Sequence, residues 1–135
     1  MIAILYPKYD KVASILAIRI GLDYDNVYVA HFSSKKLPDC DYAILIAFDK
    51  IDKTTIKRIE TLNKKGCKFL IFAHRHVDIP ILSNAEYYLF TNEDDLLYLI
   101  KFLLSNPVKD VPHLLLCQFI LSHLIHLLTK NNSPL

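Results

Sequence analysis

The feature of this sequence that most constrains its fold is the alternation of short apolar runs with amphipathic stretches. Residues 2–6, 42–48 and 69–72 carry almost no polar side chains, as expected of strands that are covered on both faces of a sheet. Between these runs, apolar residues recur at helical spacing, and Asp10 and Asp52 stand where helix N-caps are expected. This order of elements is typical of a parallel α/β sheet.

We therefore predict a single α/β domain with a five-stranded, mostly parallel sheet, helices on both faces and a C-terminal apolar helix. The expected strands are residues 2–6, 27–31, 42–48, 69–72 and 87–90. The expected helices begin at Asp10, Asp52 and Thr91 and end at Gly21, Gly66 and Asn106. Residues 1–105 would form the α/β domain. Residues 106–135 would form the apolar helix and a short tail, packed on the same domain or on a partner.

Composition excludes several classes of protein. With 135 residues, 53% of them hydrophobic and 22% charged, the chain is neither disordered nor too short for a core. A net charge of +2 gives no global attraction for nucleic acid, so any such contact must be local. Only two glycines are present, which excludes a glycine-rich phosphate loop.

The three cysteines lack paired spacing and are expected to be buried thiols in a reducing cytoplasm. The first residues lack the features of a signal peptide, which also favours a cytoplasmic location.

The segment Val111–Thr129 contains no Asp, Glu, Lys or Arg. Its length is close to that of a membrane-spanning helix, but polar side chains such as His113 and Gln118 argue against contact with lipid. We expect no membrane and a helix buried between its own domain and a partner. Its central apolar residues would form a docking surface or the core that supports one: Leu116, Phe119, Ile120, His123 and Leu127.

Charged and imidazole groups follow three of the apolar runs. Asp10 follows the first run, Asp49 follows the third, and His74 with Arg75 follows the fourth. The carboxyl ends of parallel strands meet at one edge of a sheet, where open α/β folds place their sites. Simpler interpretations remain open: Asp10 as a helix cap, Asp49 as part of a turn, and His74 as a polar group at the sheet edge.

These strand-end segments resemble the motifs of the DHH phosphoesterase superfamily. Residues 6–14 resemble the first motif, residues 41–49 resemble the strand that ends in a single metal-binding Asp, and residues 68–78 resemble the strand that ends in Asp-His-His. The resemblance puts Asp10, Asp49 and His74 at ligand positions. Other residue types stand at further motif positions, namely Tyr6, Lys8, Lys11, Ala73 and Arg75.

Family enzymes hold two divalent cations and cut phosphodiesters with a metal-activated water. Because such a clamp needs several carboxylates, the substitutions imply that this chain holds no metal and is not catalytic. Lys8 or Arg75 would instead pair with Asp10 and Asp49 and cancel their repulsion. The alternative is a minimal phosphodiesterase or single-strand exonuclease that uses manganese or magnesium. A Rossmann-like nucleotide binder is a third possibility, which the lack of a glycine-rich turn disfavours.

The resemblance further implies a function in DNA replication. Degenerate RecJ relatives in archaeal replisomes join the GINS complex and, through it, the MCM helicase. The chain is therefore expected to be a non-catalytic, cytoplasmic and nucleoid-associated replication factor that binds GINS.

A weak contact with single-stranded DNA is also expected. Cations interleaved with aromatic rings at the strand ends suit a phosphate backbone and its bases, whereas solvated loop lysines are the simpler explanation. The candidate residues are Lys8, Lys11, Lys35, Lys36 and Arg75.

Overall fold

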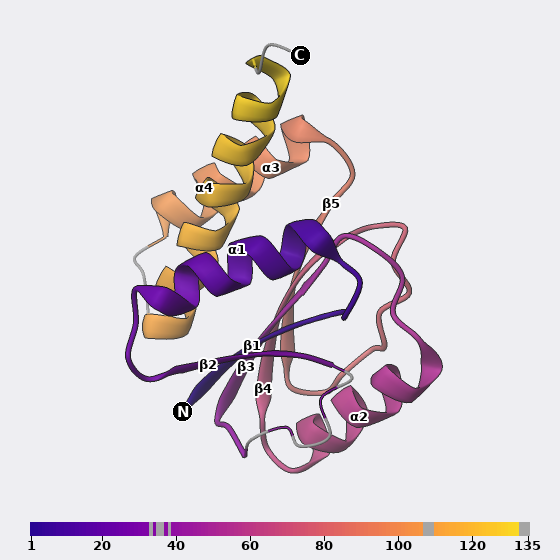
Figure 1. Cartoon of the computed structure of the whole chain (residues 1–135). Helices are drawn as coiled ribbons and strands as arrows, with labels where there is room; N and C mark the ends of the chain where they lie inside the picture. Colours follow the sequence, from indigo (N-terminus) through magenta and orange to yellow (C-terminus); the bar gives the residue numbers. More distant parts are fainter. Residues whose placement is uncertain (33, 35–36, 38, 107–109, 133–135) are drawn as a thin grey trace.

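Five short strands form one sheet in which every neighbouring pair is parallel (Figure 1). The computed structural model describes residues 1–32, 34, 37, 39–106 and 110–132, with side chains to residue 129. The predicted α/β class is confirmed, and the sheet is wholly rather than mostly parallel. The strands are β1 (Ile2–Tyr6), β2 (Val27–His31), β3 (Tyr42–Ala47), β4 (Lys68–His74) and β5 (Ala85–Phe90).

The strand order is β2-β1-β3-β4-β5. From β1 the chain passes to β2 at one edge, whereas from β3 it passes to β4 and β5 at the other edge. The direction of winding therefore reverses between β1 and β3, which pair directly. In open α/β sheets, ligands bind at this reversal, outside the carboxyl ends of the strands. The residues that follow β1 and β3 thus occupy the position where a site is expected.

Helices cover both faces of the sheet, as predicted. One face carries α1 (Lys11–Leu22), α3 (Glu93–Ser105) and α4 (Val111–Asn132), and the other carries α2 (Lys53–Lys64) (Figure 1). The first face has a core to which all three helices contribute, with Leu16, Leu99 and Phe119 among its members. On the second face, α2 shares the cover with the connections after β2 and β4, through Phe32 and Val77.

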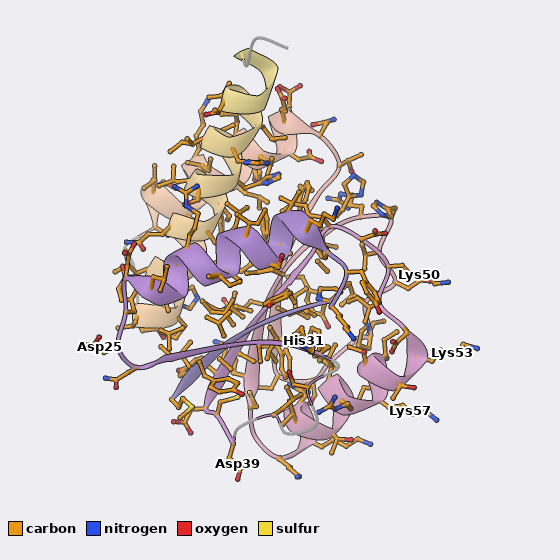
Figure 2. All side chains as sticks on the ribbon, viewed as in Figure 1. Asp25, His31, Asp39, Lys50, Lys53 and Lys57 are labelled. Atoms are coloured by element: carbon orange, nitrogen blue, oxygen red, sulfur yellow. The ribbon has the colours of Figure 1, made fainter. Side chains whose placement is uncertain are left out.

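The amphipathic pattern of α2 agrees with its position. Asp52 caps the helix by accepting a hydrogen bond from the backbone N–H of Thr55 (2.7 Å). Ile59 is buried against the sheet, while Lys53 and Lys57 point into solvent (Figure 2). The helix and its cap are therefore confirmed.

The third helix begins one residue later than predicted. Asn92, not Thr91, is its N-cap, because the Asn92 side chain accepts a hydrogen bond from the N–H of Asp95 (3.1 Å). The Asp95 carboxylate in turn accepts from the N–H of Thr91 (2.6 Å). The Asn92 and Asp95 side chains thus provide acceptors for the backbone N–H groups of Asp95 and Thr91, respectively.

The prediction that Gly21 ends the first helix is wrong. The helix α1 continues to Leu22, and Asp23 is its C-cap. Gly21 instead allows α1 to approach β2, since a Cβ added at Gly21 would lie 2.4 Å from Cγ2 of Val29. The predicted turn glycine Gly66 is confirmed, with a φ of 104°.

The substitution Gly21→Ala should lower the free energy of unfolding by about 1 kcal/mol in urea titrations. Overpacking costs about 1–3 kcal/mol, which exceeds the gain of about 1 kcal/mol from helix propensity. Adding Val29→Ala should remove part of the loss, because it deletes the clashing methyl group. Gly66→Ala is the control, because it strains a backbone with positive φ but places the new Cβ where no atom lies within 4 Å. A Gly21→Ala variant more stable than the wild type would contradict the close approach.

The C-terminal helix packs on its own domain. Leu115, Leu116, Phe119 and Ile120 are fully buried and belong to the same core as α1 and α3. The window Val111–Thr129 is long and apolar enough to cross a membrane, with a mean hydropathy of 1.6, and 44% of it is buried inside the domain. The inner face of α4 is thus part of the domain core.

Candidate functional site

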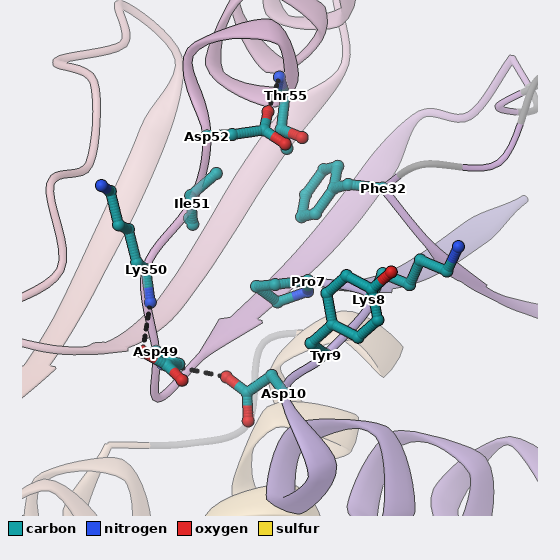
Figure 3. Close-up of a pocket in the computed structure, with 10 residues that line it drawn as sticks. All are labelled: Pro7, Lys8, Tyr9, Asp10, Phe32, Asp49, Lys50, Ile51, Asp52 and Thr55. Carbon is teal, nitrogen blue, oxygen red and sulfur yellow. Dashed lines mark hydrogen bonds between the residues drawn. The ribbon is translucent and has the colours of Figure 1, made fainter.

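A shallow hollow lies at the carboxyl ends of β1 and β3, where the winding reverses (Figure 3). Its volume is about 380 Å³. It is lined by residues 7–10 after β1, residues 49–52 after β3, and by Phe32 and Thr55. Asp10 and Asp49 are thereby brought together, as the strand-end argument predicts.

Asp10 is buried and makes three hydrogen bonds to the backbone. Its Oδ1 accepts from the N–H of Ala13 (3.1 Å). Its Oδ2 accepts from the N–H group of Phe48 (2.6 Å) and from that of Asp49 (3.0 Å), a bond drawn in Figure 3. The helix-cap interpretation of Asp10 is confirmed. The same carboxylate also joins the start of α1 to the end of β3.

Asp49 has a different environment. Its side chain is exposed, and its Oδ1 accepts a hydrogen bond from the N–H of Lys50 (2.8 Å), the next residue in the chain. This bond fits the turn interpretation, and it leaves the carboxylate accessible from the hollow.

His74 is fixed at the end of β4 by its neighbours. Its Nε2 donates to the carbonyl oxygen of Thr91 (3.1 Å), and its Nδ1 accepts from the backbone N–H of His76 (3.2 Å). The two imidazole rings also contact each other, with centroids 4.1 Å apart. Both His74 nitrogens are thus engaged within the sheet edge, and Thr91 is bound through its backbone rather than acting as a cap.

The residues at the substituted motif positions differ in exposure. Ala73 is fully buried, and its methyl group is part of the core beneath α2. Lys8, Lys11 and Arg75 are exposed. Lys35 and Lys36 lie outside the described residues. The three described cations all stand at the carboxyl-end edge of the sheet, after β1, at the start of α1 and after β4.

The hypothesis that Lys8 or Arg75 pairs with the two carboxylates is wrong. No ion pair of the described residues joins them to Asp10 or Asp49. The Lys8 ammonium instead lies over the ring of Tyr9, 5.4 Å from its centroid. Backbone N–H groups, not side-chain cations, surround the Asp10 carboxylate.

The residues at this site do not fit the two divalent cations that the resemblance implies. Both Asp10 oxygens already accept backbone hydrogen bonds, and His74 has no nitrogen left to coordinate a metal. In the described part of the chain, no three His, Cys, Asp or Glu side chains converge on a common point. Asp49 is the one ligand position whose side chain stays accessible.

Most residues predicted to face a partner are buried in the domain itself. Leu116, Phe119 and Ile120 are at most 1% exposed, and His123 is 5% exposed. As a docking surface, this prediction is wrong for these four residues, because the inward face of α4 completes the core. They form the supporting core instead, and Leu127 is half-buried at its margin.

The opposite side of α4 presents apolar side chains to solvent. The residues of this outer stripe alternate three and four positions apart, and all but the half-buried Gln118 are exposed: Val111, Leu114, Gln118, Leu121, Ile125 and Leu128. Ile125 is 62% exposed and Leu128 is 50% exposed. A stripe with this spacing is what a second helix packs against in a coiled coil.

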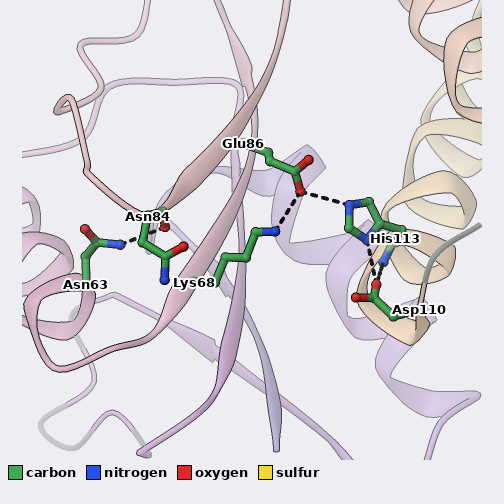
Figure 4. Close-up of polar contacts among 6 residues, drawn as sticks. All are labelled: Asn63, Lys68, Asn84, Glu86, Asp110 and His113. Carbon is green, nitrogen blue, oxygen red and sulfur yellow. Dashed lines mark hydrogen bonds and ion pairs between the residues drawn. The ribbon is translucent and has the colours of Figure 1, made fainter.

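An ionic cluster fixes the start of α4 to the opposite edge of the sheet (Figure 4). His113 donates from Nε2 to Glu86 (2.9 Å) and from Nδ1 to Asp110 (2.5 Å). Lys68 also pairs with Glu86 (3.3 Å). Burial opposes ionisation of Glu86 and Asp110, but hydrogen bonds from His113, a further one from Lys68 to Glu86, and the electrostatic attraction of His113 and Lys68 together outweigh it and hold the pKa of each carboxyl below its usual value.

His123 lies among aromatic rings beneath the strand ends. Its ring centroid is 4.3 Å from that of Phe48, and it also contacts Phe72 and Phe90. Its Nδ1 is buried without a hydrogen-bond partner among the described residues. Burial, with a smaller contribution from the charge of His126, lowers the pKa of His123 to about 4. The imidazole is therefore neutral at physiological pH.

Sequence reasoning missed several residues that the structure brings together. Lys50 and Phe32 line the hollow, and Glu86 meets His113 across 27 positions of sequence. No local spacing predicts these pairings. The alternation of the outer stripe is visible in the sequence, but an all-round apolar helix does not reveal which side faces outward.

Comparison of the chain with protein-family models, curated proteins and solved structures found no match. The resemblance to the DHH superfamily therefore stays a prediction from three strand-end segments.

Proposed function

We propose that this protein is a non-catalytic, DHH-derived replication factor that acts by binding protein partners, chiefly GINS and, through it, the MCM helicase. The observation that carries a binding role is the outer stripe of α4. The choice of GINS rests on the resemblance of the strand-end segments. In this proposal the protein is cytoplasmic and nucleoid-associated and needs no cofactor.

The chemistry of the strand-end site supports a role without catalysis. A metal-dependent phosphodiesterase needs carboxylates that are free to bind cations. Asp10 is the most buried carboxylate of this site, and backbone N–H groups occupy both of its oxygens. The hydrogen bonds that Asp10 makes to the backbone thus account for an aspartate at this position without a metal.

The outer stripe supports docking of a partner helix. Ile125 and Leu128 would pack as knobs between the side chains of a facing helix, and Gln118 would favour one register at some cost in stability. The segment Val111–Thr129 has no Asp, Glu, Lys or Arg side chain that a partner would have to desolvate. Further apolar side chains are exposed on neighbouring α3, among them Tyr98 and Phe102. Exposed apolar surface of this kind marks interaction sites.

Co-expression with GINS followed by size-exclusion chromatography tests the proposal. The two should elute together, and Ile125→Glu should weaken the complex at least tenfold, because it buries a charge in the interface. The matched control is Ile81→Glu, since Ile81 is 96% exposed in the connection after β4 and should not affect binding. Separate elution of the wild-type proteins would contradict the proposal.

The enzymatic alternative is tested with labelled short single strands and manganese. The proposal expects no cleavage above the background without protein. Cleavage that Asp49→Ala abolishes would favour the phosphodiesterase, because Asp49 is the accessible ligand position and its loss leaves the Asp10 hydrogen bonds in place.

The weak contact with single-stranded DNA is tested by electrophoretic mobility at several salt concentrations. Exposed Lys8, Lys11 and Arg75 should give binding that weakens as salt rises. Absence of binding at low salt would remove this part of the proposal.

A further inference from the structure

Two of the three thiols lie next to each other at the amino ends of neighbouring strands. The Sγ atoms of Cys40 and Cys67 are 3.3 Å apart. Cys40 precedes β3 and Cys67 precedes β4, and the two strands pair from Tyr42 with Lys68 onward. By this register Cys67 stands opposite Asp41, and Cys40 lies one residue before Asp41 in the chain. A strand spacing of about 4.7–4.9 Å and a rise of about 3.3 Å per residue still allow a Cα separation within the range of about 4.4–6.8 Å found in disulfides.

The two thiols differ in access and in protonation. Cys40 is half-buried, whereas Cys67 is 3% exposed. The hydrogen bond from Cys67 lowers the pKa of Cys40 although burial opposes this shift, and the same bond together with burial raises the pKa of Cys67. The accessible sulfur is thus the one that favours the thiolate, which is the reactive form.

We propose that Cys40 and Cys67 form an oxidation-sensitive pair that hydrogen peroxide converts into a disulfide. The Cys40 thiolate attacks one peroxide oxygen, an S–O bond forms, the O–O bond breaks, and the released hydroxide takes up a proton. Cys67 then attacks the sulfur of the resulting sulfenic acid. The S–S bond forms, the S–O bond breaks, and the Cys67 proton leaves with the oxygen as water. Two thiols are oxidised, and one peroxide is reduced to two waters.

The bond would tie two segments that are otherwise held by non-covalent contacts. Cys40 ends the connection between β2 and β3, which packs on α2 through hydrogen bonds from Arg58 to the carbonyl oxygens of Phe32 and Ser34. Cys67 lies where α2 leads into β4, and its carbonyl oxygen accepts from Asn63 (3.0 Å). The disulfide would therefore fix this connection to the second face of the domain.

The third thiol provides an internal control. Cys117 is buried in the core on the opposite face of the sheet, apart from the pair. Burial raises the pKa of Cys117, so it should react slowly with peroxide. The inference is independent of the proposed function, since it concerns the opposite edge of the sheet and a different chemistry.

The full chain is treated with hydrogen peroxide, quenched, unfolded and titrated for free thiols, and its peptides are mapped by mass spectrometry. The wild type should fall from three thiols to one, with Cys40 linked to Cys67, and dithiothreitol should restore all three. Cys117→Ser should lose its two remaining thiols in the same way. In Cys67→Ser, Cys40 should stop at a sulfenic acid that dimedone traps.

Two results would overturn the proposal. The first is a wild type that keeps all three thiols at peroxide concentrations that oxidise a free thiol peptide. The second is a linkage that involves Cys117, or one that forms only between chains. Both are measured on the wild-type protein, so the test stands even if a cysteine variant fails to fold.

Discussion

Replacing Asp10 with alanine is expected to lower the free energy of unfolding by about 4 kcal/mol. Loss of the helix cap accounts for about 1 kcal/mol. Each of the two charge-assisted hydrogen bonds to Phe48 and Asp49 adds about 1.5 kcal/mol, because those N–H groups lose a charged acceptor. The measurement is urea unfolding followed by circular dichroism.

Two other aspartates of the hollow serve as controls for this variant. Asp52→Ala removes an exposed cap with one hydrogen bond, so it should lower the free energy of unfolding much less than Asp10→Ala does. Asp49→Ala removes a single exposed bond to the next residue and should change stability little. If Asp10→Ala were no more damaging than Asp52→Ala, the link between α1 and β3 would be energetically unimportant.

The substitution Asp10→Asn separates charge from shape. It keeps one acceptor oxygen for Ala13 or for the β3 end, but its amide group would face N–H donors. We therefore expect a loss between those of Asp52→Ala and Asp10→Ala. A fully stable Asp10→Asn protein would show that the negative charge is dispensable.

Acidification is expected to destabilise the protein through His123. The folded state holds the pKa of His123 at about 4, whereas an unfolded histidine has a pKa of about 6.5. Below pH of about 6.5 the unfolded chain binds a proton that the folded chain excludes, so stability falls as pH decreases. The loss reaches on the order of 3 kcal/mol near pH 4 and is absent above pH of about 7.

The variant His123→Leu isolates this effect. It fills the same apolar site without a titratable group, so the decrease in stability between pH 6.5 and 4.5 should become smaller. His126→Gln, which alters a half-buried residue one turn later, should retain most of this pH-dependent decrease in stability. Because the pKa values of Glu86 and Asp110 lie below their usual values, the stability that these two carboxylates contribute is lost only at a lower pH than the loss caused by His123. An unchanged slope in His123→Leu would contradict the assignment.

Much of the fold follows from local patterns in the sequence. The apolar runs predict β1, β3 and β4, because a strand covered on both faces has few polar side chains, and shorter apolar stretches predict β2 and most of β5. Asp10 and Asp52 predict the starts of α1 and α2, since a cap depends on residues only three positions away. The strand-end rule brings Asp10 and Asp49 to one hollow, because parallel strands share an edge.

The candidate site was less predictable than the fold. The sequence places Asp10 at a ligand position by resemblance, but its second set of hydrogen bonds comes from residues 38 and 39 positions away. Likewise, Gly21 reads locally as a helix end, whereas Val29 of the neighbouring strand determines why a glycine is required there. Such requirements arise only where segments far apart in the sequence come into contact in the folded chain.

The sequence by itself determined the class of fold, the positions of the strands and the edge at which a site would lie. All of these depend on periodicity and on side chains within one or two turns. Only the tertiary structure decided that the Asp10 carboxylate is fully used by the backbone, that Cys40 meets Cys67, and which side of α4 is buried. The last point had no answer in the sequence, because a helix that is apolar all round can bury any of its faces against its neighbours.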